Sequence, residues 1–189
     1  MFILTPLYNA PMGYWDDMEE SPGMLGRYED AGSPEWILRI IKLGSQKGKE
    51  MEKFMIWSFN CVEDAPYSES DVRAFDFLLQ VKTAGIWADG KPKWQHIEPD
   101  HDWNALLLIT VDYHSLELHI MCREGFEEMR NDLGDKIKQG GSNSYQGYWF
   151  TDAQANPYMN HFLSISYDHP DEGEMDCDVL ENALNNCLG

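Results

Sequence analysis

The chain contains few basic residues. Among its 189 residues, 14 Lys and Arg stand against 33 Asp and Glu, so the formal net charge is −19. No Lys or Arg follows Lys138. Phosphate backbones and anionic membranes attract cations, so this composition predicts neither nucleic acid nor a membrane as a direct partner.

Several signature motifs are also missing. The four cysteines, Cys61, Cys122, Cys177 and Cys187, show no C-x-x-C spacing, which argues against a zinc ribbon. A domain of this size needs no disulfide staples, so we expect four free thiols and a cytoplasmic location. The start of the chain lacks a basic signal-peptide region, and no apolar run reaches the length of a membrane span. G-x-S-x-G, Walker and dinucleotide-binding glycine motifs are absent.

The composition is that of a folded protein. Apolar residues make up 43% of the chain and aromatic residues 13%, which predicts one domain over residues 1–189. Its mixed order of helical and strand patterns favours an α+β fold. We expect a largely antiparallel sheet of about six strands, with about four helices packed mainly on one face.

Hydrophobic periodicity and turn residues place these elements along the chain. Strands are expected at 1–8, 53–62, 106–111, 116–122, 145–151 and 161–168. Helices are expected from 33 to about 44, at 68–85, at 125–141 and at 173–187. Residues 9–32, rich in Gly, Pro and acids, are expected to form an irregular acidic arm or loop.

The C-terminal stretch from Tyr167 carries seven carboxylates and no basic residue. It does not fit a calcium loop, because the register that places Gly173 sixth leaves Pro170 and Val179 at ligand positions. The residues from Val179 to Leu188 instead follow the spacing of a helix with one buried face. The stretch therefore predicts the capped, acidic start of a last helix.

The acids exceed what capping requires, and they alternate with aromatic residues in "YWDDMEES". Carboxylates and rings together can mimic a nucleic acid and steer fast association with a basic protein. We therefore expect an acidic binding protein that neutralises a basic, nucleic-acid-acting partner, as an immunity protein or a phage-type anti-defence inhibitor does. The alternative that the acidity only confers solubility stays open. The candidate partner-binding residues are Tyr14, Trp15, Asp16, Asp17, Glu19, Glu20, Asp171, Glu172, Glu174, Asp176 and Asp178.

A metal-dependent hydrolase is the alternative function. His96, His101, His114 and His119 lie within 24 residues, among several Asp and Glu, and imidazole with carboxylate suits transition metals. No H-E-x-x-H or H-x-H spacing is present, so the sequence predicts no tightly bound metal and no cofactor. The sequence therefore leaves enzymatic activity open and gives more support to a binding protein.

Overall fold

The computed structural model describes residues 22–65, 70–139, 147–166 and 175–187. The strand expected at 1–8 and most of the arm expected at 9–32 lie outside these ranges. The last part of that arm is not irregular, because residues Pro22–Asp30 form helix α2. Its Tyr28 is fully buried, so side-chain burial stabilises this short helix where acidic composition suggested a loop.

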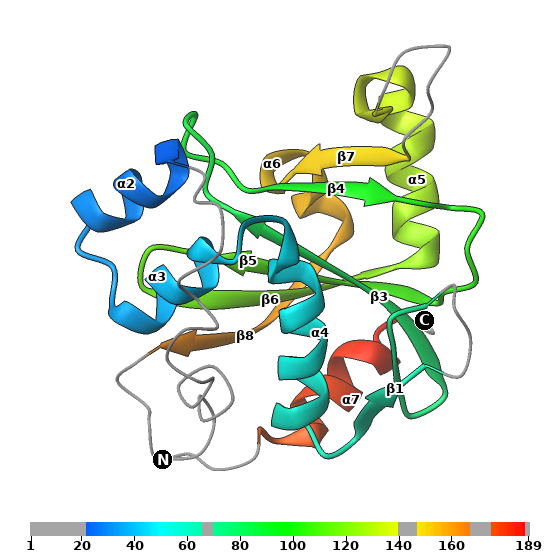
Figure 1. Ribbon diagram of the computed structural model, residues 1–189. Helices are drawn as coiled ribbons and strands as arrows, with labels where there is room; N and C mark the ends of the chain where they lie inside the picture. Colours follow the sequence, from blue (N-terminus) through cyan, green and yellow to red (C-terminus); the bar gives the residue numbers. More distant parts are fainter. Residues whose placement is uncertain (1–21, 66–69, 140–146, 167–174, 188–189) are drawn as a thin grey trace.

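A six-stranded sheet forms the centre of the protein, in the order β1-β2-β3-β5-β6-β8 (Figure 1). Every neighbouring pair is antiparallel except β3 and β5, which run parallel. A separate antiparallel pair joins β4 to β7. The strands are β1 Val62–Asp64, β2 Val72–Ala74, β3 Phe77–Gly85, β4 Lys93–Ile97, β5 Ala105–Val111, β6 Ser115–Cys122, β7 Tyr148–Thr151 and β8 Asn160–Ser166.

Two hydrophobic cores cover the two faces of the large sheet. Helices α2, α3 (Glu35–Lys42), α4 (Lys47–Ser58) and α7 (Cys177–Asn185) contribute to the first core. Helices α5 (Arg123–Leu133) and α6 (Asp152–Ala155), with β4 and β7, form the second. Short 3-10 turns occupy Gly44–Gln46, Gly134–Ile137 and Asn156–Tyr158. The expected α+β class, with a largely antiparallel sheet and most helices on one face, is confirmed.

Strand β5 explains why both faces need a cover. All seven of its residues are buried. Leu107 and Ile109 belong to the first core, whereas Leu106 and Leu108 belong to the second. An apolar strand of this kind is stable only in the middle of a sheet that is covered on both sides.

Two expected elements are wrong. The segment 53–62 is not a strand, because α4 runs to Ser58 and buries Met51, Phe54 and Met55 on one helical face. The segment 68–85 is not a helix but the β2–β3 hairpin and its approach. Tertiary packing overrides local preference in both segments.

The four cysteines form two disulfides, Cys61–Cys177 and Cys122–Cys187. The expectation of four free thiols is therefore wrong: spacing along the chain is no guide when the partners are 116 and 65 residues apart. Disulfides persist in oxidising compartments, so the thiol argument for a cytoplasmic location no longer holds. Within the described ranges, no helix is long and apolar enough to span a membrane.

Candidate functional site

The β2–β3 hairpin brings three polar residues together. Asp71 stands directly before β2, and its backbone N–H donates to the carbonyl of Leu79 at 3.0 Å. Its carboxylate Oδ2 accepts from the N–H of Val81 at 2.7 Å. The β2–β3 ladder ends at Val72 and Leu79, and Asp71 lies just beyond that end, beside residues 79–81 of β3. Residues two apart on a strand share a face, so Lys82 lies on the same side as Gln80.

Gln80 is the unusual member of this group. It is only 4% exposed, and its side-chain Oε1 has no hydrogen-bond partner among the described residues. Leaving a buried amide oxygen unpaired costs about 1–3 kcal/mol, so native proteins seldom do it without a ligand or a role. Its strand neighbours, Leu79 and Val81, are ordinary members of the first core.

Glu52 reaches the same group from helix α4. Burial, with a smaller contribution from the nearby Asp71 carboxylate, raises the pKa of the Glu52 carboxyl to about 7. Positive charge on Lys82, Lys49 and Lys53 acts in the opposite direction but does not outweigh burial. Glu52 is therefore a carboxyl group that can gain or lose a proton near neutral pH.

Asp71 and Lys82 are also shifted toward their neutral forms. Burial raises the pKa of Asp71, although the Val81 N–H, Lys82 and His101 oppose the shift. Burial lowers the pKa of Lys82, against the attraction of Asp71, Glu98 and Glu52. Several partly buried charges of both signs thus interact in a small space, an arrangement that is enriched at functional sites.

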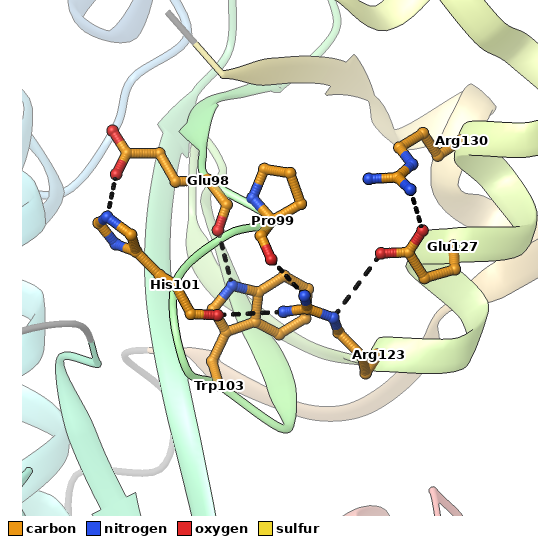
Figure 2. Close-up of polar contacts among 7 residues, drawn as sticks. All are labelled: Glu98, Pro99, His101, Trp103, Arg123, Glu127 and Arg130. Atoms are coloured by element: carbon orange, nitrogen blue, oxygen red, sulfur yellow. Dashed lines mark hydrogen bonds and ion pairs between the residues drawn. The ribbon is translucent and has the colours of Figure 1, made fainter.

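The loop 98–103 supplies the remaining charged groups, and Arg123 at the start of α5 fixes its course (Figure 2). The Arg123 guanidinium donates to the carbonyls of His101, at 3.3 Å, and Pro99. It also lies 4.1 Å from the ring centroid of Trp103. The Trp103 Nε1–H donates to the Glu98 carbonyl at 2.9 Å, so both ends of the loop are tied down.

Two side chains of this anchored loop, Glu98 and His101, pair with each other. His101 Nε2 and Glu98 Oε2 are 2.6 Å apart. Glu127 stabilises the anchor from α5, 3.7 Å from Arg123 and 2.7 Å from Arg130 (Figure 2). The loop can therefore present Glu98 and His101 to Lys82 and Asp71 without losing its own shape.

Oxygen donors dominate the site. In the part of the chain that the structure describes, no three His, Cys, Asp or Glu residues are grouped closely enough to hold a metal ion. Mg²⁺ does not require such a cage, because it keeps several waters and binds one or two carboxylates together with substrate phosphates. The Asp71 carboxylate and the Gln80 amide are oxygen donors of the kind that this ion takes, and Glu52 lies close enough to Asp71 for their charges to interact. Lys82 adds a compact positive charge for an anionic substrate.

Most of the predicted partner-binding residues lie outside the described residues, namely Tyr14, Trp15, Asp16, Asp17, Glu19, Glu20, Asp171, Glu172 and Glu174. Asp176 and Asp178 are described. The Asp178 N–H donates to the Asp176 carboxylate at 2.9 Å, and Asp176 is the N-cap of α7. The last helix is thus confirmed, although it begins at Cys177 and not near residue 173; the expected capping pair, Asp171 and Glu174, lies outside the described residues, and the binding role stays a prediction.

The predicted histidine set does not form one site. His101 faces the Asp71 group, whereas His119 packs beside the rings of Trp94 and His161 over the second core. His114 is exposed between β5 and β6, and His96 is exposed with a positive φ of 57°. Among the described residues, these histidines are therefore not grouped in one place, and the hypothesis of a His/Asp centre from His96 to His119 stays a prediction.

Sequence reasoning missed Asp71, Gln80 and Lys82. The segment 68–85 was assigned to a helix, and helical spacing separates these residues onto different faces. The signal that could have found them is the alternation Leu79, Gln80, Val81, Lys82, which is typical of a strand with one polar face.

Comparison with known proteins gives little further guidance. No protein-family model matches the chain. No curated protein matches it either. Among solved structures, it is similar to a chain described as a restriction endonuclease in complex with substrate DNA, with 14% sequence identity. That match covers 87% of this chain and 90% of the other, but its TM-score of 0.43 is too low to support a conclusion.

Proposed function

We propose that the protein is a divalent-cation-dependent hydrolase of phosphate esters, with phosphodiesters as the substrate class. The observation that carries this proposal is the buried, unpaired Gln80 oxygen on the stretch of β3 whose Lys82 interacts electrostatically with Asp71 and whose Val81 N–H donates to the Asp71 carboxylate. An amide oxygen and a carboxylate can bind a hard cation, and the lysine can bind the phosphate that the cation shares.

Each residue has a distinct role in this scheme. Asp71 and Gln80 would hold the cation, and such an ion would supply polarisation of a phosphoryl oxygen. Lys82 stabilises negative charge that develops on the phosphoryl group. Glu52, with a pKa of about 7, accepts a proton from the attacking water. His101, paired with Glu98, is placed to assist proton transfer at the edge of the site.

The local charge supports a phosphate substrate even though the whole chain is acidic. Lys49 and Lys53 on α4 act electrostatically on Glu52, and both are exposed. Residues 33–61 carry five basic and three acidic residues, so this stretch alone is net positive. An anionic substrate would therefore approach the site along α4.

The test is hydrolysis of bis-(p-nitrophenyl) phosphate and of labelled single-stranded and double-stranded DNA and RNA, with Mg²⁺, Mn²⁺ or EDTA. Lys82→Met and Gln80→Leu should each lower kcat/KM by about 100-fold or more, since each removes one transition-state contact. Lys91→Met, an exposed lysine in the turn before β4, is the matched control and should retain activity. Activity that persists in EDTA, or that survives Lys82→Met, would overturn the proposal, as would failure to hydrolyse any of these substrates.

The acidic-binder hypothesis is the second candidate, and the observation that favours it is the one-signed charge of the C-terminal stretch. Its test is the association rate with a basic partner at low and high salt. Asp176→Lys/Asp178→Lys should slow association mainly at low salt, because exposed charges act over a Debye length of roughly 8–10 Å. An association rate that is unchanged in this variant would mean that Asp176 and Asp178 have no role in binding the partner.

A further inference from the structure

A cavity of about 280 Å³ lies where the β2–β3 turn, the end of the 98–104 loop and the start of α5 meet. No residue that we assign to the hydrolytic reaction lines it. The residues around it are Asp76, Phe77, Trp103, Asn104, Arg123, Glu124 and Cys187.

Two rings give the cavity apolar walls that are already fixed. Phe77 is 8% exposed and Trp103 is 3% exposed, so only a small part of each reaches the cavity. Asn104 is held by three bonds: its N–H donates to the Leu78 carbonyl, its carbonyl accepts from the Arg123 N–H, and its side-chain Oδ1 accepts from the Leu78 N–H. The cavity is therefore rigid and has little free hydrogen-bonding capacity in its walls.

The two acidic residues set the charge of the opening. Arg123 also lines the cavity, but its guanidinium is directed at the carbonyls of Pro99 and His101, and Glu127, 3.7 Å away, balances part of its charge (Figure 2). The carboxylates of Asp76 and Glu124 are exposed, and neither has a hydrogen bond or ion pair within the described ranges. The cavity thus combines apolar walls with two unpaired negative charges at the surface.

From this combination we infer that the cavity receives one arginine or lysine side chain of a partner protein. The aliphatic stem of such a side chain packs against rings while its charged end stays near water and carboxylates. Arginine in particular anchors protein interfaces by filling pockets. The net charge of −19 attracts basic surfaces, and this cavity gives that attraction a defined point of contact.

The inference does not depend on the hydrolase proposal and can be tested without activity. The probe is the blocked tripeptide acetyl-Gly-Arg-Gly-amide, titrated into the ¹⁵N-labelled full chain and followed by NMR at Trp103 Nε1–H and the Asn104 side-chain amide. We expect saturable shifts at these two groups, with a dissociation constant on the order of 1 mM. The lysine tripeptide should give similar shifts, whereas the citrulline tripeptide, of the same shape but uncharged, should not.

Two variants separate this site from general attraction. Asp76→Asn/Glu124→Gln should weaken binding of the arginine peptide at least tenfold, whereas Asp64→Asn/Glu128→Gln removes the same charge from exposed positions outside the cavity and should leave binding intact. Equal shifts with citrulline, equal weakening in both variants, or no saturable shift would each overturn the inference. Tighter binding of spermidine than of the arginine peptide would also overturn it, because the site would then select free polyamines and not a protein side chain.

Discussion

The protonation of Glu52 offers the most direct test of the site's electrostatics. Its pKa in the folded protein is about 7, against an ordinary value of 4.5 for a glutamate, with burial as the main cause. The folded state therefore holds this proton more tightly than the unfolded state does. Stability is greatest below the unfolded pKa, and it falls as pH rises from about 4.5 to about 7. Above about pH 7 the stabilisation that came from protonated Glu52 is fully lost, and stability no longer changes with the ionisation of this group.

The size of this loss can be bounded. At 1.36 kcal/mol per pKa unit, a fully buried group with this shift would cost about 3 kcal/mol. Glu52 is only partly buried, and solvent screening reduces the figure to about 1 kcal/mol. Glu52→Gln keeps the shape of the protonated side chain and removes the ionisation. We therefore expect the variant to match the wild type at pH 4.5 and to be about 1 kcal/mol more stable at pH 8.

Urea unfolding, followed by tryptophan fluorescence at the two pH values, measures this difference. Glu128→Gln, an exposed position on α5, is the control and should show no dependence on pH relative to the wild type. Addition of Mg²⁺ or Mn²⁺ at pH 8 should stabilise the wild type by RT ln(1 + [L]/Kd), about 1.4 kcal/mol at ten times Kd, and the variant by less. An equal stability difference at both pH values, or a variant that is weaker at pH 8, would refute the electrostatic account of Glu52.

Three further outcomes follow from the structure. No thiol should react with a thiol reagent in denaturant before reduction, and Cys122→Ser/Cys187→Ser should lower the free energy of unfolding by about 4 kcal/mol in the chain-entropy view; reaction of four thiols without reductant would contradict the pairing. Arg123→Lys, which loses the two-carbonyl fork and the stacking, should cost about 1–3 kcal/mol in urea unfolding, whereas Arg73→Lys in an exposed ion pair should cost less than about 1 kcal/mol; equal costs would show that Arg123 is no anchor. Phe75 has a φ of 54° and is exposed, so Phe75→Asn should raise the melting temperature by relieving about 1 kcal/mol of backbone strain; a lower melting temperature would mean that its ring contributes more than the strain costs.

Much of the fold could be predicted from local patterns. The β5–β6 hairpin was expected because Leu116, Leu118 and Ile120 alternate with polar residues, and the structure pairs the two strands in one continuous register. Helix α3 was expected from Ser33, Pro34 and Glu35, although the Ser33 side chain makes no capping bond. Both elements can be predicted locally, because their buried residues recur along the sequence at the spacing of one strand face or one helix face.

The site could not be predicted in this way, because its assembly depends on long-range pairing. Gln80 and Lys82 become neighbours of Asp71 only after β3 turns back on β2, and Glu52 joins them only through the packing of α4 on the sheet. The hydrophobic residues of 68–85 fit the spacing of a helix about as well as that of a strand. The segment forms a strand because β3 is buried on both of its faces in the folded protein. The disulfides were missed for a related reason: each joins residues that only the folded chain brings together.

The acidity of the whole chain does not exclude the proposed phosphate substrate, because exposed charges act only over a short range. A bound group responds to charges within roughly 8–10 Å at physiological salt, and more distant exposed charges are largely screened. Lys49, Lys53 and Lys82 act electrostatically on the Glu52 carboxyl of the site. The composition argued against phosphate partners only because it treats charge as an average over the surface. In the folded protein the basic residues of α4 act on the Glu52 carboxyl, so in the proposed scheme the local field, and not the net charge, would decide which substrate approaches.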